Sequence, residues 1–173
     1  MAKRTRPELS DDEREVRAEQ LKERVYVTFT ALAIVLALRS HASETTAGEA
    51  ATTLAIAVVG TLLAVFVADF VSHIAVHERM PDRAELRHMI GVTASALGVL
   101  ILPMIFLALA GLDAWTVDGA LLAASIALIA SLVAVGFFAI RRVRLPIAQR
   151  LIVLLAEAVL GLAVIGLELL AHG

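Results

Sequence analysis

Four long runs of apolar residues constrain this chain more than any other feature of its sequence. They occupy residues 50–76, 89–112, 119–140 and 151–171. The only formal charges inside them are Asp69 in the first run and Glu157 and Glu168 in the last. A helix of about 20 apolar residues, rising ~1.5 Å per residue, crosses the hydrocarbon core of a bilayer. With 60% of the residues hydrophobic, the runs predict an all-α polytopic membrane protein.

A fifth, shorter run precedes the other four. Residues 25–38 carry no charge, and Arg24 and Arg39 flank them. Long arginine side chains can place their charge at the interface, which lengthens the usable span. A cleaved signal peptide is the competing interpretation, but the run starts late and lacks a small-residue cleavage site. We therefore expect a charged, helical extension over 1–24 and a five-span domain over 25–173.

The distribution of Lys and Arg predicts the orientation. Residues 1–24 hold seven, and the connections after the first four expected spans hold one, three, none and four in turn, with none after the last. Basic residues are retained on the cytoplasmic side. The alternation places the N-terminus in the cytoplasm and the C-terminus outside, and it supports the short first span. We expect the membrane to be a bacterial inner membrane.

Local signals predict where the helices begin and bend. The sequence Ser-Asp-Asp-Glu at 10–13 is typical of a capping box, followed by one helix that continues into the first span. Asp82, with Glu85 three residues later, predicts the start of the third span. Pro103 lacks an N–H for the Val99 carbonyl and should kink that span. No connection is long enough to form a separate domain.

Small residues recur every four positions within the apolar runs, which favours close helix packing in lipid. The second span carries Gly60, Ala64, Ala68 and Ser72, and the fourth carries Gly119, Ala123, Ala127 and Ser131. These stripes predict packing within one chain or, alternatively, the contact surface of a homodimer.

The acidic residues inside the runs are the candidate functional groups. Asp69, His73 and His77 are spaced by four residues and share one helix face near the cytoplasmic side. Glu157 lies at a broadly similar depth, and a buried acid there needs a partner or a proton. We predict an ion or proton site at Asp69, His73 and Glu157, with Asp69 and His73 as the candidate metal ligands. His77 and Glu78 would form its inner mouth. The alternative is structural: Asp69 reaches cytoplasmic water and Glu157 is neutral and hydrogen-bonded.

Enzymatic chemistry has little support in the sequence. Cysteine is absent, and so are the Gly-x-Ser-x-Gly, His-Glu-x-x-His and phosphate-loop motifs. No basic patch with interleaved aromatics indicates a nucleic-acid partner. We expect no catalysis and no resident cofactor, with a divalent metal ion as a candidate substrate.

The layout resembles the vacuolar iron transporter family over about residues 23–171. Residues 60–78, GTLLAVFVADFVSHIAVHE, are similar to the second span of that family, and 98–111, GVLILPMIFLALAG, to the third. The resemblance implies five spans, a homodimer and movement of a metal ion. The first span lacks the acid of that family, 63–67 lack its methionine, and the cytoplasmic metal-binding insertion is missing. It therefore implies the fold more strongly than the iron chemistry.

Two functions remain open from the sequence. The first is movement of a divalent cation or of coupled protons through a small helical bundle. The second is a non-transporting accessory or assembly role in the membrane, exerted through helix–helix contacts.

Overall fold

The structure is a computed structural model that describes residues 11–141 and, beyond them, only Ile152, Leu155, Val159, Ala163 and Gly166. The ordered elements between residues 11 and 141 are all helical. They are α1 (Asp11–Ser40), α2 (Ala47–His77), α3 (Arg83–Ala96), the 3₁₀ turn η1 (Leu97–Leu100), α4 (Ile101–Gly111) and α5 (Val117–Arg141). The predicted all-α class is confirmed for this part of the chain.

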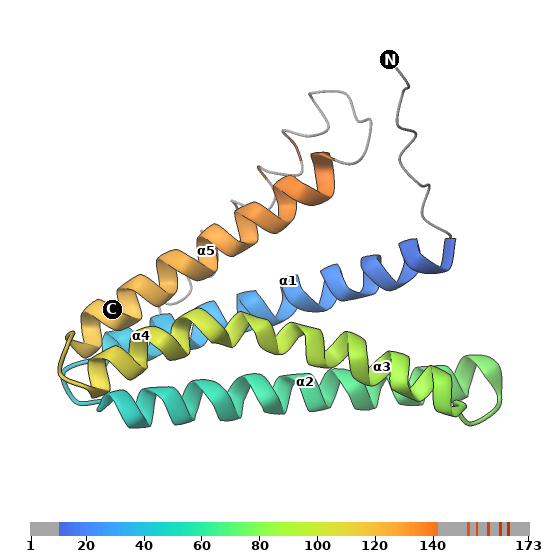
Figure 1. The fold of residues 1–173 in the computed structure, drawn as a ribbon, viewed down its shortest axis with the longest axis horizontal. Coiled ribbons are helices and arrows are strands. Elements are labelled where there is room, and N and C mark those ends of the chain that lie inside the picture. Colours follow the sequence, from blue (N-terminus) through green and yellow to red (C-terminus); the bar gives the residue numbers. More distant parts are fainter. Residues whose placement is uncertain are drawn as a thin grey trace, which may run out of the picture.

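The helices run roughly lengthwise between two ends of the molecule (Figure 1). Helix α2 lies antiparallel to the rod formed by α3, η1 and α4, while α1 lies between that pair and α5. We call one end the Arg79 end; it holds the connection 78–82 and the start of α1. The other, the Trp115 end, holds the connections 41–46 and 112–116. Helix α5 diverges from α1 toward its own C-terminal end.

Two helix features predicted from the sequence can be compared with the structure, and both are confirmed. Helix α1 is one continuous helix from Asp11 to Ser40, which confirms that the charged segment runs into the first apolar run. Asp82 caps α3 by accepting from the N–H groups of Ala84 and Glu85, and Glu85 completes a capping box. The capping box expected at 10–13 lies outside the described side chains.

A short 3₁₀ turn interrupts the helix that contains Pro103. The turn covers Leu97–Leu100, directly before α4. Pro103 cannot donate to the carbonyl of Val99, so regular α-helical bonding is lost over the preceding turn. A change of helix type therefore lies just before the residue where a kink was predicted, within the stretch Arg83–Gly111.

Three helical stretches of the described chain are long and apolar enough to cross a membrane. They are Ala47–His77, Arg83–Gly111 and Val117–Phe137. Helix α1 is not one of them, because Glu23, Arg24 and Arg39 closely bracket its apolar run. The expected last span, 151–171, lies outside the described residues. The structure therefore gives three candidate spans where the sequence predicted five.

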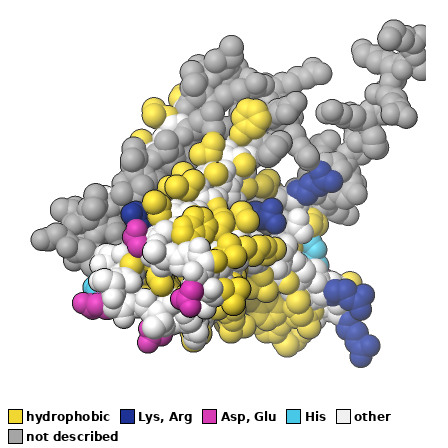
Figure 2. All heavy atoms as spheres, turned by 60° about the vertical axis from the view of Figure 1, so that its left-hand side comes forward, with side chains coloured by type: hydrophobic (Ala, Val, Ile, Leu, Met, Phe, Trp, Pro, Cys, Tyr) yellow, Lys and Arg dark blue, Asp and Glu magenta, His cyan; other side chains and the backbone are white. Residues whose placement is uncertain are grey.

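The surface of the candidate spans fits a lipid environment. Only 17% of the most apolar window of α2 is buried inside the molecule, and 33% of that of α5. Exposed apolar side chains cover the middle of the molecule, with acidic groups toward the left of the view and most basic groups toward its right (Figure 2). Contiguous apolar surface of this extent is unfavourable in water and is normal in hydrocarbon.

Helix α1 is the best-buried helix of the bundle over its apolar half. Val27, Ala31, Leu32 and Val35 have no exposed surface. They pack into one core with residues of α2, η1, α4 and α5. This face of α1 therefore contacts protein rather than lipid, and α1 is less apolar overall than α2 because residues 11–24 are mostly charged or polar.

The small-residue stripes have different environments. Gly60, Ala64, Ala68 and Ser72 of α2 are all exposed, whereas Gly119, Ala123, Ala127 and Ser131 of α5 are half-buried. The α5 stripe thus fits packing within the chain, and the α2 stripe has little intrachain contact in the part of the chain that the structure describes.

Candidate functional site

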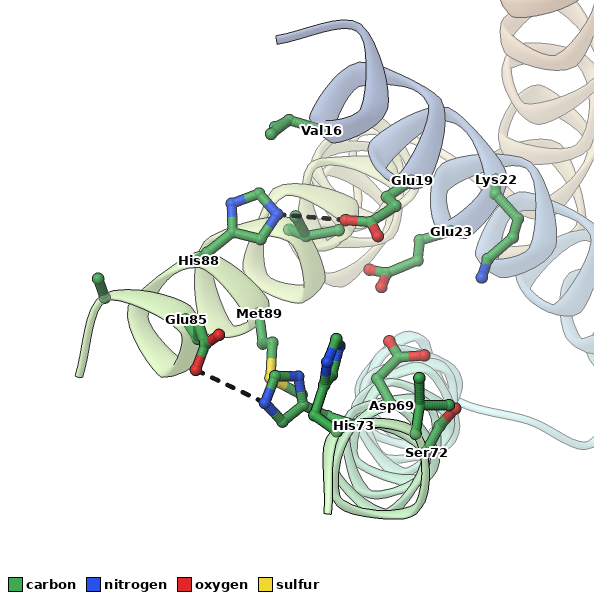
Figure 3. A pocket seen from close by; sticks show the side chains of 14 residues that line it. Val16, Glu19, Lys22, Glu23, Asp69, Ser72, His73, Glu85, His88 and Met89 are labelled. Carbon is green, nitrogen blue, oxygen red and sulfur yellow. Dashed lines mark hydrogen bonds and ion pairs between the residues drawn. The ribbon is translucent and has the colours of Figure 1, made fainter. Parts of the chain in front are cut away.

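A pocket of about 780 Å³ opens at the Arg79 end, between α1, α2 and α3. It holds most of the titratable side chains that these helices turn toward one another (Figure 3). They are Glu19, Glu23, Asp69, His73, Glu85 and His88. The pocket has a buried inner side, with Glu23 and Val92, and an exposed rim that includes His77 and Ala84. It is therefore a polar recess that reaches into the bundle from the molecular surface.

The structure brings three of the predicted site residues into this pocket. Asp69, His73 and His77 all line it, from successive turns of α2. The rings of His73 and His77 lie 4.5 Å apart between centroids. Glu78 is not part of the lining; it ends α2 in a left-handed conformation with φ of 52°, and its N–H donates to the Ile74 carbonyl. Glu157 lies outside the described residues, so its place in the site stays a prediction.

The partner of Asp69 is a second acid, Glu23 of α1, which the sequence analysis did not single out. The two carboxyl groups face each other across the pocket wall (Figure 3). Glu23 is only 3% exposed, and its Oε2 has no hydrogen-bond partner. Burial, followed by the nearby charge of Asp69, raises the pKa of Glu23 to about 7. This carboxyl can therefore take up or release a proton near neutral pH.

A pair formed by an acid and a histidine, Glu85 and His73, lies across the pocket from Glu23. Arg79 donates to Glu85 Oε2 at 2.8 Å, so Glu85 is already neutralised by an arginine. His73 Nε2 lies 3.5 Å from the same Glu85 oxygen. That distance is too long for a good hydrogen bond, and the buried Nε2 makes no hydrogen bond. The histidine thus has an unused ring nitrogen inside the recess.

A third pair connects α1 to α3 at the rim. His88 Nε2 and Glu19 Oε2 are 3.2 Å apart. Both side chains are partly exposed, so the pair contributes little to stability on its own. Its effect is to hold the charged half of α1 against α3, which closes one side of the pocket.

The described side chains do not form a metal site. No three His, Asp or Glu groups among them converge in a way that could hold a metal ion. Asp69 and His73 supply two candidate ligands, and structural and catalytic metal sites use three or more. Because Glu157 lies outside the described part, the metal prediction stays a prediction.

The sequence contained part of the signal for the residues it did not predict. Glu19 and Glu23 are four positions apart on α1, and Glu85 and His88 three apart on α3, so each pair shares a helix face. Periodicity shows which residues share a face but not which faces meet. The contact of α1 with α2 and α3 was needed to bring Glu23 to Asp69.

The fold and its apolar surface place the chain among the helical membrane proteins, with a polar pocket at one end of the bundle. Comparisons with protein-family models, with curated proteins and with solved structures gave no match.

Proposed function

We propose that the protein moves protons or a divalent cation across the bilayer, and that the pocket at the Arg79 end is the cytoplasmic entrance of the path. The observation that carries the proposal is the buried Glu23 carboxyl, with an unpartnered oxygen, opposite Asp69. A buried carboxyl without a cation is costly, and such groups in membrane proteins mark ion or proton paths. Asp69 would bind the cation, Glu23 would exchange a proton, and His73 would connect the pair to the rim.

The proposal includes five spans with the N-terminus in the cytoplasm. Helix α1 would be the first span, since other helices bury one face of its apolar half, at Val27, Ala31, Leu32 and Val35. Residues 151–171 would be the last span. Lys22, Arg79, Arg83 and Arg87 gather at the Arg79 end, whereas Arg39 lies at the other, and this asymmetry supports a cytoplasmic Arg79 end. A relationship with the vacuolar iron transporters belongs to the same proposal.

Flux through reconstituted protein tests this function. The full chain in liposomes should carry protons or a divalent metal ion, reported by trapped dyes, above the rate of protein-free vesicles. Asp69→Asn keeps the shape of the side chain and removes its charge, so we expect flux to fall about tenfold or more. Glu44→Gln, in the exposed connection at the Trp115 end, is the matched control and should leave flux unchanged. Equal leakage from protein-loaded and empty vesicles would refute transport.

One observation favours the accessory function instead. The α2 stripe of Gly60, Ala64, Ala68 and Ser72 is exposed, and small residues let a second membrane helix approach closely. Under this alternative, the stripe contacts another copy of the chain or a different membrane protein. Replacing Ala64 and Ala68 by Leu would then abolish cross-linked dimers or complexes, and the liposome flux would be absent in every variant.

A further inference from the structure

The volume of the pocket is large for a bare metal ion. Sites for small organic molecules typically have volumes of roughly 300–1,000 Å³, and this pocket has about 780 Å³. A bound metal ion would leave most of it to water, and no three-ligand group stands ready among the described side chains. The pocket is therefore better suited to a ligand with a body as well as a charge.

The charges of the pocket favour a cation. Its described lining contains the acids Glu19, Glu23, Asp69 and Glu85 and one lysine, Lys22. Glu85 is paired with Arg79, and Glu19 contacts His88. Glu23 and Asp69 remain as two facing acids on the inner side, and a positive group between them would stabilise the ionised form of Glu23, whose pKa burial and Asp69 raise.

The buried end of the pocket offers a specific hydrogen-bond acceptor. Only 3% of the surface of Glu23 is exposed, and its Oε2 has no hydrogen-bond partner. A protonated amine has N–H groups that can donate to this oxygen, and a charge-assisted bond of this kind is stronger than a neutral one. If Glu23 only exchanged a proton, it would use the same oxygen, but it would not need a pocket of this volume beside it.

The remaining wall is apolar. Val16, Val76, Met89 and Val92 line the pocket together with the acids. Val92 is buried near Glu23, while Val76 is exposed at the rim, so apolar contact extends from the anchor to the opening. This combination suits a hydrocarbon or aromatic group attached to an ammonium head.

We propose that the pocket at the Arg79 end binds a protonated organic amine of small-molecule size, with the Glu23 carboxyl as its charged anchor and the valines and Met89 as its apolar wall. The inference goes beyond the proposed function, because it assigns to the same pocket a ligand that is neither a proton nor a divalent metal ion. It concerns binding, so it can succeed or fail separately from transport.

Calorimetry on the full chain in detergent tests the inference with one pair of probes. Phenethylamine is a cation at neutral pH, and 2-phenylethanol has nearly the same shape without the charge. We expect saturable binding of the amine and none of the alcohol. Glu23→Gln should weaken amine binding about tenfold or more, while Glu44→Gln should not change it. Equal affinity for amine and alcohol, or equal affinity in the two variants, would overturn the proposal.

A second variant guards against misfolding. Val92→Phe should fill the buried side of the pocket and abolish amine binding while the acids remain. If Glu23→Gln does not fold, retained affinity in Val92→Phe overturns the proposal and lost affinity supports it. Amine binding without liposome flux would support the binding site and refute transport. Proton or metal flux in a protein that does not bind the amine would support transport and overturn this inference.

Discussion

The two ends of the molecule have pockets of similar volume, but the polar groups of one pocket have partners and a buried polar group of the other has none. The pocket at the Arg79 end has about 780 Å³, and one at the Trp115 end, lined by residues such as Thr46, Thr116 and Asp118, has about 720 Å³. At the Trp115 end, Arg39 Nε donates to Asp118 at 3.0 Å and Thr46 pairs with Glu49 in a capping box. At the Arg79 end, Glu23 keeps an unpartnered buried oxygen.

The difference shows that volume alone does not identify a functional site. Polar groups at the Trp115 end are used to begin α2 and to join α1 to α5, so they stabilise the fold. Buried polar groups without partners lower stability, and their retention needs another reason. The comparison therefore favours a structural role for the polar groups at the Trp115 end, and it supports the proposed ligand or proton chemistry at the Arg79 end.

The largest expected effect is a loss of liposome flux that occurs only for substitutions at the Arg79 end. Glu23→Gln and Asp69→Asn should each reduce liposome flux about tenfold or more, and the double variant should lose no more than the stronger single variant, because the facing acids act as one unit. Glu44→Gln with Asp118→Asn, at the Trp115 end, should stay within about twofold. Comparable losses at the two ends would remove the distinction.

The next largest effect is the part of the pH dependence of stability that is due to Glu23. Its pKa is 4.5 ordinarily and about 7 in the folded chain, so the folded state binds the proton more tightly than the unfolded state. This contribution is fully present below about pH 4.5 and is lost as the pH rises through 7. The upper bound is roughly 3 kcal/mol.

SDS-induced unfolding in mixed micelles at several pH values measures this contribution. Wild type should lose stability between pH 5 and pH 8 relative to Glu23→Gln, which has no carboxyl to ionise. Other titratable groups line the same pocket and are present in both proteins, so their effect cancels in the comparison. They are Asp69, His73 and His77 of α2, Glu85 and His88 of α3, and Glu19 and Lys22 of α1. Parallel pH profiles in wild type and variant would show that Glu23 does not titrate in this range.

A smaller effect concerns the cap of α2 at the Trp115 end. Thr46→Ala removes the hydroxyl that accepts from the Glu49 N–H and breaks the capping box. The expected loss is about 1 kcal/mol in the free energy of unfolding. Amine binding and flux per folded molecule should be unchanged. A change in amine affinity would mean that the two ends are not separable.

The smallest effect is the exposed ion pair. Asp118→Asn removes the contact with Arg39, whose side chain is 38% exposed, against 58% for Asp118. Exposed pairs of this kind contribute at most about 1 kcal/mol, and the contribution falls at high salt. Unfolding at low and high salt, compared with wild type, should show a small difference that salt removes.

Local signals predicted the helices well, because caps, prolines and apolar runs act within a few residues. Asp82 begins α3, and the helix is distorted just before Pro103, as expected. Helix α1, expected from the sequence to be the first span, was harder to predict, because its apolar run is short and its burial against other helices is a tertiary property. Composition therefore recognised the three candidate spans that the described residues contain, whereas the environment of α1 depends on its neighbours.

The site was predicted in part for the same reason. The positions of Asp69, His73 and His77 on one α2 face follow from helical spacing and are confirmed. Glu23 is a charged residue beside two other charged residues, Lys22 and Arg24, so nothing local distinguishes it from a solvated position. Only the packing of α1 against α2 and α3 makes it buried and places it opposite Asp69.

The unbroken course of α1 has a mechanical consequence. Glu23 and Arg39 belong to the same helix, about 24 Å apart along its axis and roughly 160° apart around it. Glu23 faces α2, and Arg39 holds α5 through Asp118. One rod therefore carries a buried carboxyl against α2 at one end of the molecule and a salt bridge to α5 at the other, so α1 connects the two ends directly.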